Sequence, residues 1–375
     1  MLTTPSRRAL GLGLACCILG SCLGASPDSL DELPDIVASS KYIDYRTDAD
    51  VSALCMEDTL AREDRFIDDV AAFLAVDPPT GRIEFVWDPH QSFMENLPDC
   101  TSPIACYRYY KEENYGRIIS SGFAQYHELV HAVEIPALGE RGRILAEGFA
   151  SYLGSNNNTA PLLPDFSPRF HASLDEPPGD YLVAMHFVGS IIERHGVEKY
   201  KQMRRSDLAD GDPAEFAELF ESIYDYPLAD ALAEMSAKPI RGKNPAFGCV
   251  DDSVETIAWT APRLIETRID GQCGDGWFVG PGFIDDRSSG FGKEFRIEIL
   301  DEGIYEFSLR STDGSEPHPE GSLSSCETGD GHISLEGLTI VGKFAPGRHV
   351  LSVAFPRSDT PRGEAMLHLK RDPAP

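Results

Sequence analysis

The chain has 375 residues, of which 42% are hydrophobic, a composition typical of a folded protein long enough for two domains. Lys and Arg number 33 against 61 Asp and Glu, so the formal net charge is -28 at pH 7. Because this charge repels nucleic-acid phosphates and anionic membrane surfaces, we expect no nucleic-acid partner.

The N-terminus has the pattern of an export signal. Arg7 and Arg8 precede an apolar run, residues 9–20, that is too short to span a bilayer as a helix. The sequence LGSC at 19–22 resembles a bacterial lipobox, in which the cysteine is lipidated and becomes the new N-terminus. We therefore expect a lipoprotein signal peptide over 1–21, lipid on Cys22 and a place in the bacterial cell envelope, anchored to a membrane. The alternative is an ordinary signal peptide with incidental cysteines.

Cysteine usage agrees with export. Beyond Cys22 six cysteines remain, namely Cys55, Cys100, Cys106, Cys249, Cys273 and Cys326. An even number in an exported chain is compatible with three disulfides. Cys100 and Cys106 flank a short Pro-containing turn and are the first predicted pair; Cys273 with Cys326 is the second, and Cys55 with Cys249 follows by elimination.

Residues 22–40 are polar and rich in Pro and Ser, and they predict a tether. Residues 41–245 predict a mostly helical domain with a small sheet. Helical spacing covers about 50–76, 121–134, 143–154, 180–194, 196–205 and 213–236, and strands are expected over 82–87 and 114–120. We expect Pro136 to end the helix that precedes it. The polar stretch 238–248 marks a boundary.

Residues 246–375 have a different pattern. Short alternating runs at 295–300, 304–311, 333–341, 349–355 and 365–371 are separated by Gly, Asp and Pro. They predict an all-β antiparallel sandwich, so the whole chain is expected to be α+β. Turns led by Asp or Gly before each strand, with GRHVLSVAF near the end, resemble the jelly-roll modules appended to secreted bacterial peptidases.

The motif HELVH, residues 127–131, gives the sharpest functional signal. In a helix His127 and His131 lie on the same face and can offer two imidazole nitrogens to one metal ion. Glu128 is offset toward the place of a water molecule at the metal, whose proton it can take. An HExxH string arises by chance roughly 0.02 times in such a chain, so coincidence is a weak alternative.

Glu147 is the expected third ligand. It lies in a helical pattern, RILAEGFASYL, that could return beside the first helix, and Gly148 would let the two helices approach closely. Two His and one Glu with a fourth position open to water form the ligand set of catalytic rather than structural zinc. The predicted cofactor is therefore Zn²⁺.

HELVH followed by LAEGFASYL resembles the gluzincin metallopeptidases, whose pattern is HExxH, a short loop and a helix carrying E-G-[apolar]-A. The resemblance covers about 120 residues, from Tyr115 to Met235, and implies a zincin-like catalytic domain. It implies zinc ligation by His127, His131 and Glu147, with Glu128 as the general base. In this chain the two motifs are separated by a short connection, which must be tight.

The resemblance also bears on the substrate. The strand that marks gluzincin aminopeptidases is absent, which favours an endopeptidase, and NYGRIIS at 114–120 could serve as a sheet edge that pairs with an extended peptide. Tyr181 opens a downstream helix at the family's Tyr position and is the expected oxyanion donor, with His186 and His171 as alternatives. Glu134 could orient a histidine, although a solvated charge is the favoured interpretation.

Three functions remain open from the sequence. The first is an exported zinc metallopeptidase acting on a peptide or protein substrate. The second is a zinc hydrolase of a non-peptide amide, which would share every ligand. The third is a non-catalytic surface lipoprotein whose sandwich domain binds a partner; the intact Glu128 argues against it, because a structural site needs no base beside the metal.

The lipobox predicts a chemical modification. Labelled fatty acid should enter the wild-type protein in the native host, whereas Cys22→Ser should remain unlabelled because it lacks the thiol that carries the lipid. Gel fluorography of the two purified proteins makes the comparison. Equal labelling of both would contradict lipidation at Cys22.

Overall fold

The computed structural model describes residues 33–51, 54–89, 105–154, 159–160, 163, 165–175, 180–243, 249, 253–275, 278–282, 290–313, 319–326, 333–336, 339–355 and 362–372. Among them it contains eight α-helices and several β-sheets, so the α+β class is confirmed. Residues Pro34–Pro375 belong to one compact unit, and the description concerns this unit. Cys22 and Cys100 lie outside the described residues.

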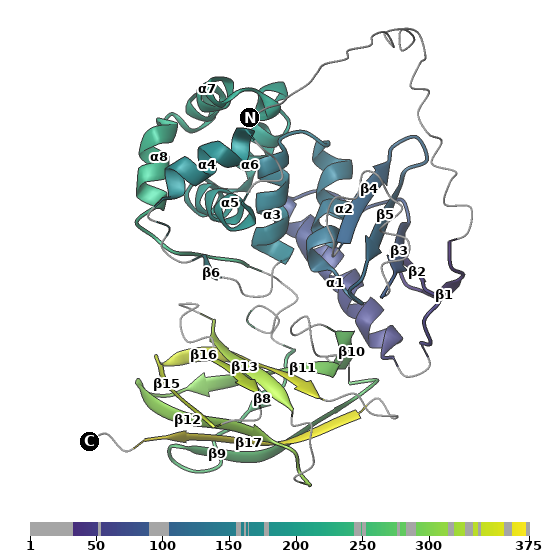
Figure 1. Cartoon of the computed structure of the whole chain (residues 1–375), viewed down its shortest axis with the longest axis vertical. Helices are drawn as coiled ribbons and strands as arrows, with labels where there is room; N and C mark the ends of the chain where they lie inside the picture. Colours follow the sequence, from purple (N-terminus) through teal and green to yellow (C-terminus); the bar gives the residue numbers. More distant parts are fainter. Residues whose placement is uncertain are drawn as a thin grey trace, which may run out of the picture. The chain divides into compact units, whose positions relative to one another are not determined.

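The first part of the chain forms a five-stranded sheet with helices on one side (Figure 1). The strand order is β1-β2-β3-β5-β4, and only the outermost pairs, β1 with β2 and β4 with β5, are antiparallel. The strands are β1 (Ile36–Ser39), β2 (Ile43–Arg46), β3 (Ile83–Trp87), β4 (Ala105–Tyr110) and β5 (Tyr115–Ser120). The end of the predicted tether thus forms β1, a strand of the sheet.

Every described helix except α4 lies in or beside a stretch where the periodicity predicts a helix. The helices are α1 (Met56–Leu74), α2 (Tyr126–Leu138), α3 (Arg143–Gly154), α4 (Phe166–Asp175), α5 (Tyr181–His195), α6 (Val197–Arg204), α7 (Pro213–Tyr224) and α8 (Leu228–Met235). Their apolar faces and the inward residues of the sheet share one buried core that runs from Tyr42 to Met235. The pattern at 213–236 forms two helices because Asp225 adopts a left-handed φ of 54° and Pro227 is the N-cap of the next helix.

Two predictions about this region are wrong. Pro136 does not end its helix, because α2 continues to Leu138 with the proline in its last turn, where the missing N–H removes a single hydrogen bond. The strand at 114–120 is not a sheet edge either. β5 pairs with β3 on one side and with β4 on the other, so β4 is the outer strand.

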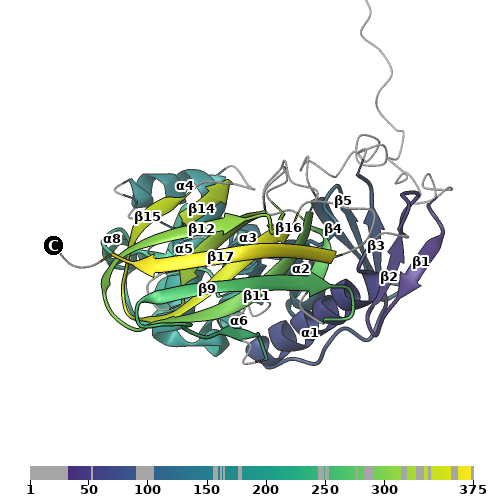
Figure 2. The same ribbon diagram turned by 90° about the horizontal axis from the view of Figure 1, so that it is seen from below.

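The second part of the chain forms a β-sandwich. Two sheets face one another, with strand orders β10-β11-β16-β13-β14 and β15-β12-β17-β9, and share a core that includes Phe295, Phe307 and Leu351. Figure 2 shows β9, β17 and β12 side by side. The strands are β9 (Leu264–Gln272), β10 (Phe278–Gly282), β11 (Gly290–Ile299), β12 (Gly303–Arg310), β13 (Glu320–Ser325), β14 (Ile333–Glu336), β15 (Ile340–Phe344), β16 (Gly347–Phe355) and β17 (Arg362–Arg371). The single strand expected at 333–341 is divided between β14 and β15, one in each sheet.

Two further strand pairs are short. β8 (Thr256–Ile257) pairs with β11, and β6 (Thr159–Ala160) pairs with β7 (Ile240–Arg241). The predicted boundary at 245 and 246 stays a prediction, because residues 244–248 lie outside the described part of the chain.

The disulfides correct two predicted pairings. Cys55 pairs with Cys273 and Cys249 pairs with Cys326, so the predicted Cys273–Cys326 and Cys55–Cys249 bonds are wrong. Cys106 is also disulfide-bonded, and its predicted pairing with Cys100 stays a prediction. Spacing along the chain could not reveal the bond between Cys55 and Cys273, because it joins residues 218 positions apart that folding brings together.

Polar side chains of α1 accompany that disulfide. Gly274 donates its backbone N–H to Asp58 at 2.5 Å, and Gly280 donates to Thr59 Oγ1 at 3.4 Å. Arg62 and Glu294 of β11 form an ion pair at 3.3 Å, with each side chain only 6% exposed. One face of α1 is therefore polar because it contacts residues of the sandwich strands and their turns, not solvent.

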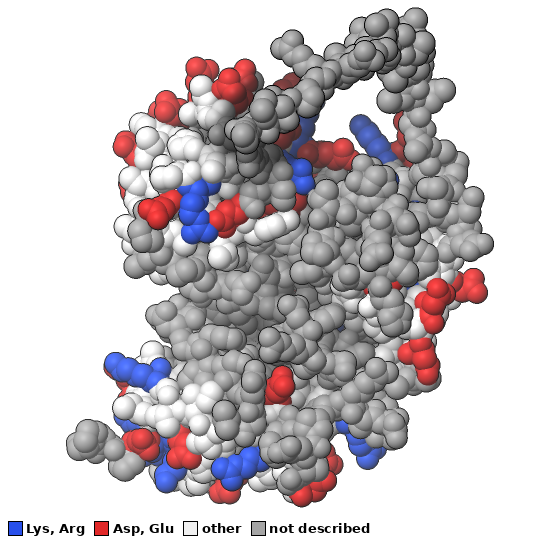
Figure 3. All heavy atoms as spheres, in the orientation of Figure 1, with Lys and Arg blue, Asp and Glu red and all other residues white. Residues whose placement is uncertain are grey.

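The excess of acid lies partly on the helices. Glu215, Glu218 and Glu221 are exposed along α7, and Figure 3 shows acidic side chains over this region. The surface there repels other anions.

Candidate metal centre

α2 presents two histidines on one face. His127 and His131 lie one helical turn apart, and their ring centroids are 4.9 Å from one another. The start of α2 is held by core contacts, since Tyr126 packs on Phe66 of α1 with ring centroids 4.8 Å apart. The two rings therefore project from a helix that is fixed at the end where the site begins.

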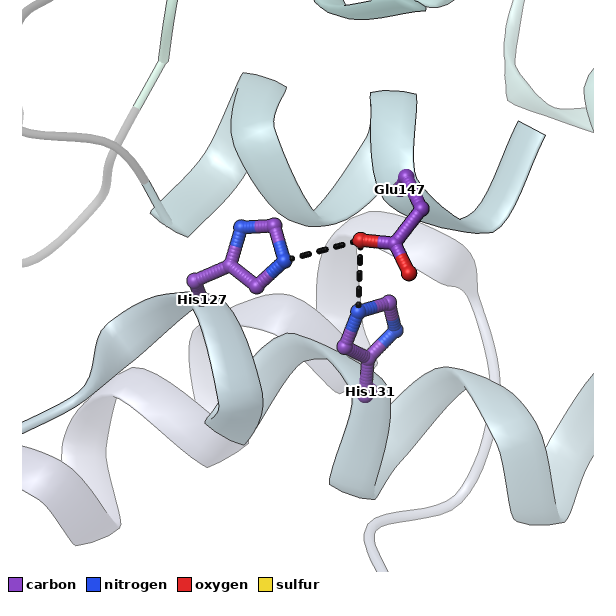
Figure 4. Close-up of side chains that lie close together, drawn as sticks. All are labelled: His127, His131 and Glu147. Carbon is purple, nitrogen blue, oxygen red and sulfur yellow. Dashed lines mark hydrogen bonds and ion pairs between the residues drawn. The ribbon is translucent and has the colours of Figure 1, made fainter. Parts of the chain in front are cut away.

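Glu147 of α3 points between these rings (Figure 4). Its Oε2 lies 3.1 Å from His127 Nε2 and 3.5 Å from His131 Nε2. The three ligand-type atoms all lie within 4.8 Å of one another. The structure thus brings together the three residues that the sequence singled out, from two different helices.

Glycine explains how α3 can return so closely beside α2. A Cβ atom on Gly154, the last residue of α3, would lie 2.5 Å from the Cα of His127. The turn between the helices contains Gly139 and Gly142 with positive φ of 94° and 66°, which side chains rarely allow. The two helices consequently run antiparallel, with the end of α3 against the beginning of α2.

The close-contact role predicted for Gly148 belongs to a different pair of helices. A Cβ on Gly148 would lie 2.4 Å from the carbonyl oxygen of Ala184 in α5. Gly148 therefore lets α3 pack on α5, whereas Gly154 lets it pack on α2. Both contacts constrain the helix that carries Glu147.

The charges at the site favour an ionised carboxylate. Burial raises the pKa of Glu147, but hydrogen bonds from His127 and His131 outweigh it and hold that pKa well below its usual range. Burial lowers the pKa of His131, and the hydrogen bond and charge of Glu147 overcome this, so its pKa is raised. Glu147 is therefore held in the form that binds cations.

Glu128 and Tyr181 border the same site. Glu128 is 8% exposed, and Tyr181 is 42% exposed with its ring centroid 5.8 Å from that of His127. Burial and the charges of Glu147 and Glu128 raise the pKa of Tyr181 to about 12, so its hydroxyl stays protonated and can donate a hydrogen bond. Asp180 caps α5 by accepting from the N–H groups of Leu182 and Val183, which fixes the start of this helix.

The alternative oxyanion donors lie elsewhere. His186 is 0% exposed and packs on Phe166 with ring centroids 4.8 Å apart, so it does not face solvent as a donor at the site would. Burial lowers its pKa to about 4, which keeps the ring neutral. His171 is exposed on α4, beside Phe170.

The favoured interpretation of Glu134 is wrong. This side chain is 0% exposed and forms an ion pair with Arg204, also 0% exposed, at 2.6 Å. It does not orient His131, because His131 Nδ1 and Glu134 Oε2 are both buried without a hydrogen-bond partner in the described part of the chain. The sequence analysis does not predict that Tyr200 and Arg204 are the partners of Glu134. Their four-residue spacing, which puts both side chains on one face of a predicted helix, is a signal that could have indicated it.

The donors are of the kinds that zinc binds, and two of their three separations fit a zinc ion. Tetrahedral zinc with bonds of about 2.0–2.2 Å separates neighbouring ligand atoms by roughly 3.4 Å. The distances of 3.1 and 3.5 Å from Glu147 Oε2 to the two Nε2 atoms lie close to that value. The side chains of His127 and Glu147 are 22% and 16% exposed, so solvent reaches the site.

Comparisons with known proteins do not identify a family. No protein-family model matches the chain, and no curated protein matches it. The pre-peptidase C-terminal domain of a collagenase from Bacillus anthracis is 13% identical with a TM-score of 0.20, covering 32% of this chain and 97% of that one. PliG, a periplasmic inhibitor of g-type lysozyme from Salmonella Typhimurium, is 10% identical with a TM-score of 0.22, covering 32% and 100%. A family 35 carbohydrate-binding module from Clostridium thermocellum is 15% identical with a TM-score of 0.17, covering 31% and 96%. At these TM-scores the likenesses support no conclusion about function.

The geometry predicts that zinc binding needs both helices. His131→Ala and Glu147→Ala should each lose bound zinc on dialysis, because each removes one of three protein ligands. Metal analysis by mass spectrometry should find about one zinc per wild-type chain and far less in either variant. His171→Ala, which removes an exposed histidine outside the site, is the control and should keep its metal. Full zinc content in Glu147→Ala would show that the third ligand is a different residue.

Proposed function

We propose that the protein is an exported zinc-dependent metallopeptidase, an endopeptidase rather than an aminopeptidase. The observation that carries this proposal is the meeting of His127, His131 and Glu147 at a solvent-reached site bordered by Glu128 and Tyr181. Two His and one Glu form a ligand set of catalytic zinc, which keeps a fourth position for water or substrate.

A bound zinc ion would supply Lewis acidity, which polarises a scissile carbonyl and makes a water molecule easier to deprotonate. His127, His131 and Glu147 would hold the ion. The closeness of their ligand atoms, which all lie within 4.8 Å of one another, supports this assignment.

Glu128 acts as the general base and acid. Its position directly after His127 places it beside the ligands without making it one. Its negative charge helps to raise the pKa of both His131 and Tyr181. The carboxylate takes a proton from the attacking water and passes it to the amine as the peptide bond breaks. General acid-base catalysis of this kind contributes about 10²- to 10⁴-fold.

The hydroxyl of Tyr181 donates a hydrogen bond to the oxygen that becomes negative in the transition state. The phenol is protonated at neutral pH, since its pKa is about 12, and its ring lies against that of His127. A preorganised donor of this kind stabilises developing charge without rearrangement during the reaction.

Strand β4 offers a way to hold the substrate. It is the outer strand of the sheet and it contacts α2, the helix that carries both histidines. An extended peptide could pair with such an edge through main-chain hydrogen bonds, whatever its side chains. Recognition of backbone rather than of a chain terminus is what an endopeptidase requires.

The disulfides support a location outside the cytoplasm. Bonds such as Cys55–Cys273 and Cys249–Cys326 form and persist in oxidising compartments and are rare in the cytoplasm. No helix in the described ranges is both long enough and apolar enough to cross a bilayer. Attachment to a membrane through lipid on Cys22 is part of the proposal.

The mechanism predicts that Glu128→Gln separates chemistry from metal binding. Glutamine has nearly the shape of glutamate but cannot accept the proton, so peptide cleavage should fall by at least about a hundredfold while zinc stays near one per chain. A peptide-library digest followed by mass spectrometry measures cleavage, and metal analysis of the same sample measures zinc.

Glu218→Gln is the matched control for this experiment, because Glu218 is exposed on α7. It should cleave as the wild type does. Undiminished cleavage by Glu128→Gln would refute the mechanism. Zinc binding by the wild type without any peptide cleavage would instead favour hydrolysis of a non-peptide amide, and absence of zinc would favour a binding protein.

A further inference from the structure

Behind the metal site lies a buried polar cluster formed by Glu134, Tyr200 and Arg204. Arg204 Nε donates to Glu134 Oε1 at 2.6 Å, and both side chains are 0% exposed. The Tyr200 hydroxyl lies 2.5 Å from the same oxygen, and Tyr200 is also 0% exposed. Glu134 follows His131 by three residues, so the cluster begins less than one helical turn beyond a ligand.

The cluster contacts both helices that carry the ligands. Tyr200 on α6 also places its hydroxyl 3.2 Å from the carbonyl oxygen of Leu145, two residues before Glu147 on α3. A single hydroxyl therefore faces one acceptor on α2 and another on α3. These two contacts lie next to His131 on one helix and next to Glu147 on the other.

Arg204 extends the contact to the turn between the helices. Its Nη2 donates to the carbonyl oxygen of Gly139, the residue that ends α2, at 3.0 Å. A Cβ on Gly142, just before α3, would lie 3.5 Å from its Nη1. The connection from α2 to α3 thus wraps around the guanidinium of Arg204.

Stability alone is a poor reason for such a cluster. Moving two charges out of water is costly, and apolar pairs often replace buried ion pairs with equal or greater stability. Here Glu134 Oε2 and Arg204 Nη1 lack a hydrogen-bond partner among the described residues, which adds to the cost. The cluster instead fixes how the helices it contacts lie relative to one another, because hydrogen bonds set distances and angles that apolar contacts leave free.

We propose that Glu134, Tyr200 and Arg204 are positioning residues for the metal centre, which fix α2 and α3 so that His131 and Glu147 reach one ion. The inference rests on the proposed function, since it requires that these residues bind zinc. None of the three touches the metal or the substrate. They act through the helices, in the manner of outer-shell partners, whose loss costs about 10- to 100-fold in metal affinity.

The full-length protein with Tyr200→Phe tests the proposal. This change removes only the hydroxyl that faces both helices and keeps the ring that packs on Phe149. We expect the zinc dissociation constant, measured by chelator competition, to rise about 10- to 100-fold. The absorption spectrum of the Co²⁺-loaded variant should also change, because it reports ligand geometry.

Tyr305→Phe is the matched control. Tyr305 is a buried tyrosine of the sandwich, and its hydroxyl donates to the Asp301 carbonyl oxygen at 2.7 Å. Its loss should lower resistance to urea in the metal-free protein without changing zinc affinity or the cobalt spectrum. If Tyr200→Phe behaved in the same way, with wild-type zinc affinity and spectrum, the cluster would be structural only and the proposal would be overturned.

A double variant, Glu134→Leu with Arg204→Leu, separates positioning from stability. Replacing both charges avoids leaving one of them unpaired, so the metal-free protein should unfold at a similar or higher urea concentration. Its zinc affinity should nevertheless fall at least about tenfold. Wild-type affinity in this variant would overturn the proposal while leaving the zinc site intact, whereas a wild type that bound no zinc would overturn the proposed function together with it.

Discussion

The candidate site depends on the close antiparallel contact between α2 and α3. Glu147 can reach both histidines only because the backbone of Gly154, at the end of α3, lies against His127, at the beginning of α2. A methyl group at that position would have to push the helices apart, and interiors packed as densely as crystals transmit such shifts over several residues. The distance between the ligand atoms is therefore set by a glycine that makes no contact with an ion.

The same contact explains the electrostatics. A buried carboxylate is costly unless hydrogen bonds or opposite charges accompany it. Around Glu147 those partners are the two imidazoles, and around Glu134 they are Arg204 and Tyr200. The α2–α3 pair consequently contains two polar centres. One is reached by solvent and open to a cation, and the other is closed and already neutralised by Arg204.

Local sequence patterns predicted the residues of the site and their meeting, but not the contacts that hold the two helices together. HELVH and LAEGF identified the ligand residues, and apolar spacing identified the helices that carry them, because both signals lie within a few turns of chain. Two contacts join positions that are far apart in the sequence, namely the disulfide between Cys55 and Cys273 and the packing of Gly154 on His127. The spacing of apolar residues within one helix or strand cannot predict such contacts. The burial of Glu134 is not predictable from its neighbours in sequence, because its partner, Arg204, lies 70 residues further along. The outer position of β4 likewise depends on how strands are ordered in the sheet.

X-ray diffraction from crystals of the zinc-loaded protein, collected on both sides of the zinc absorption edge, tests the central claim most directly. The account predicts a strong anomalous peak about 2.0–2.2 Å from His127 Nε2, His131 Nε2 and an oxygen of Glu147. A zinc peak bound by other residues, or no peak between α2 and α3, would contradict it.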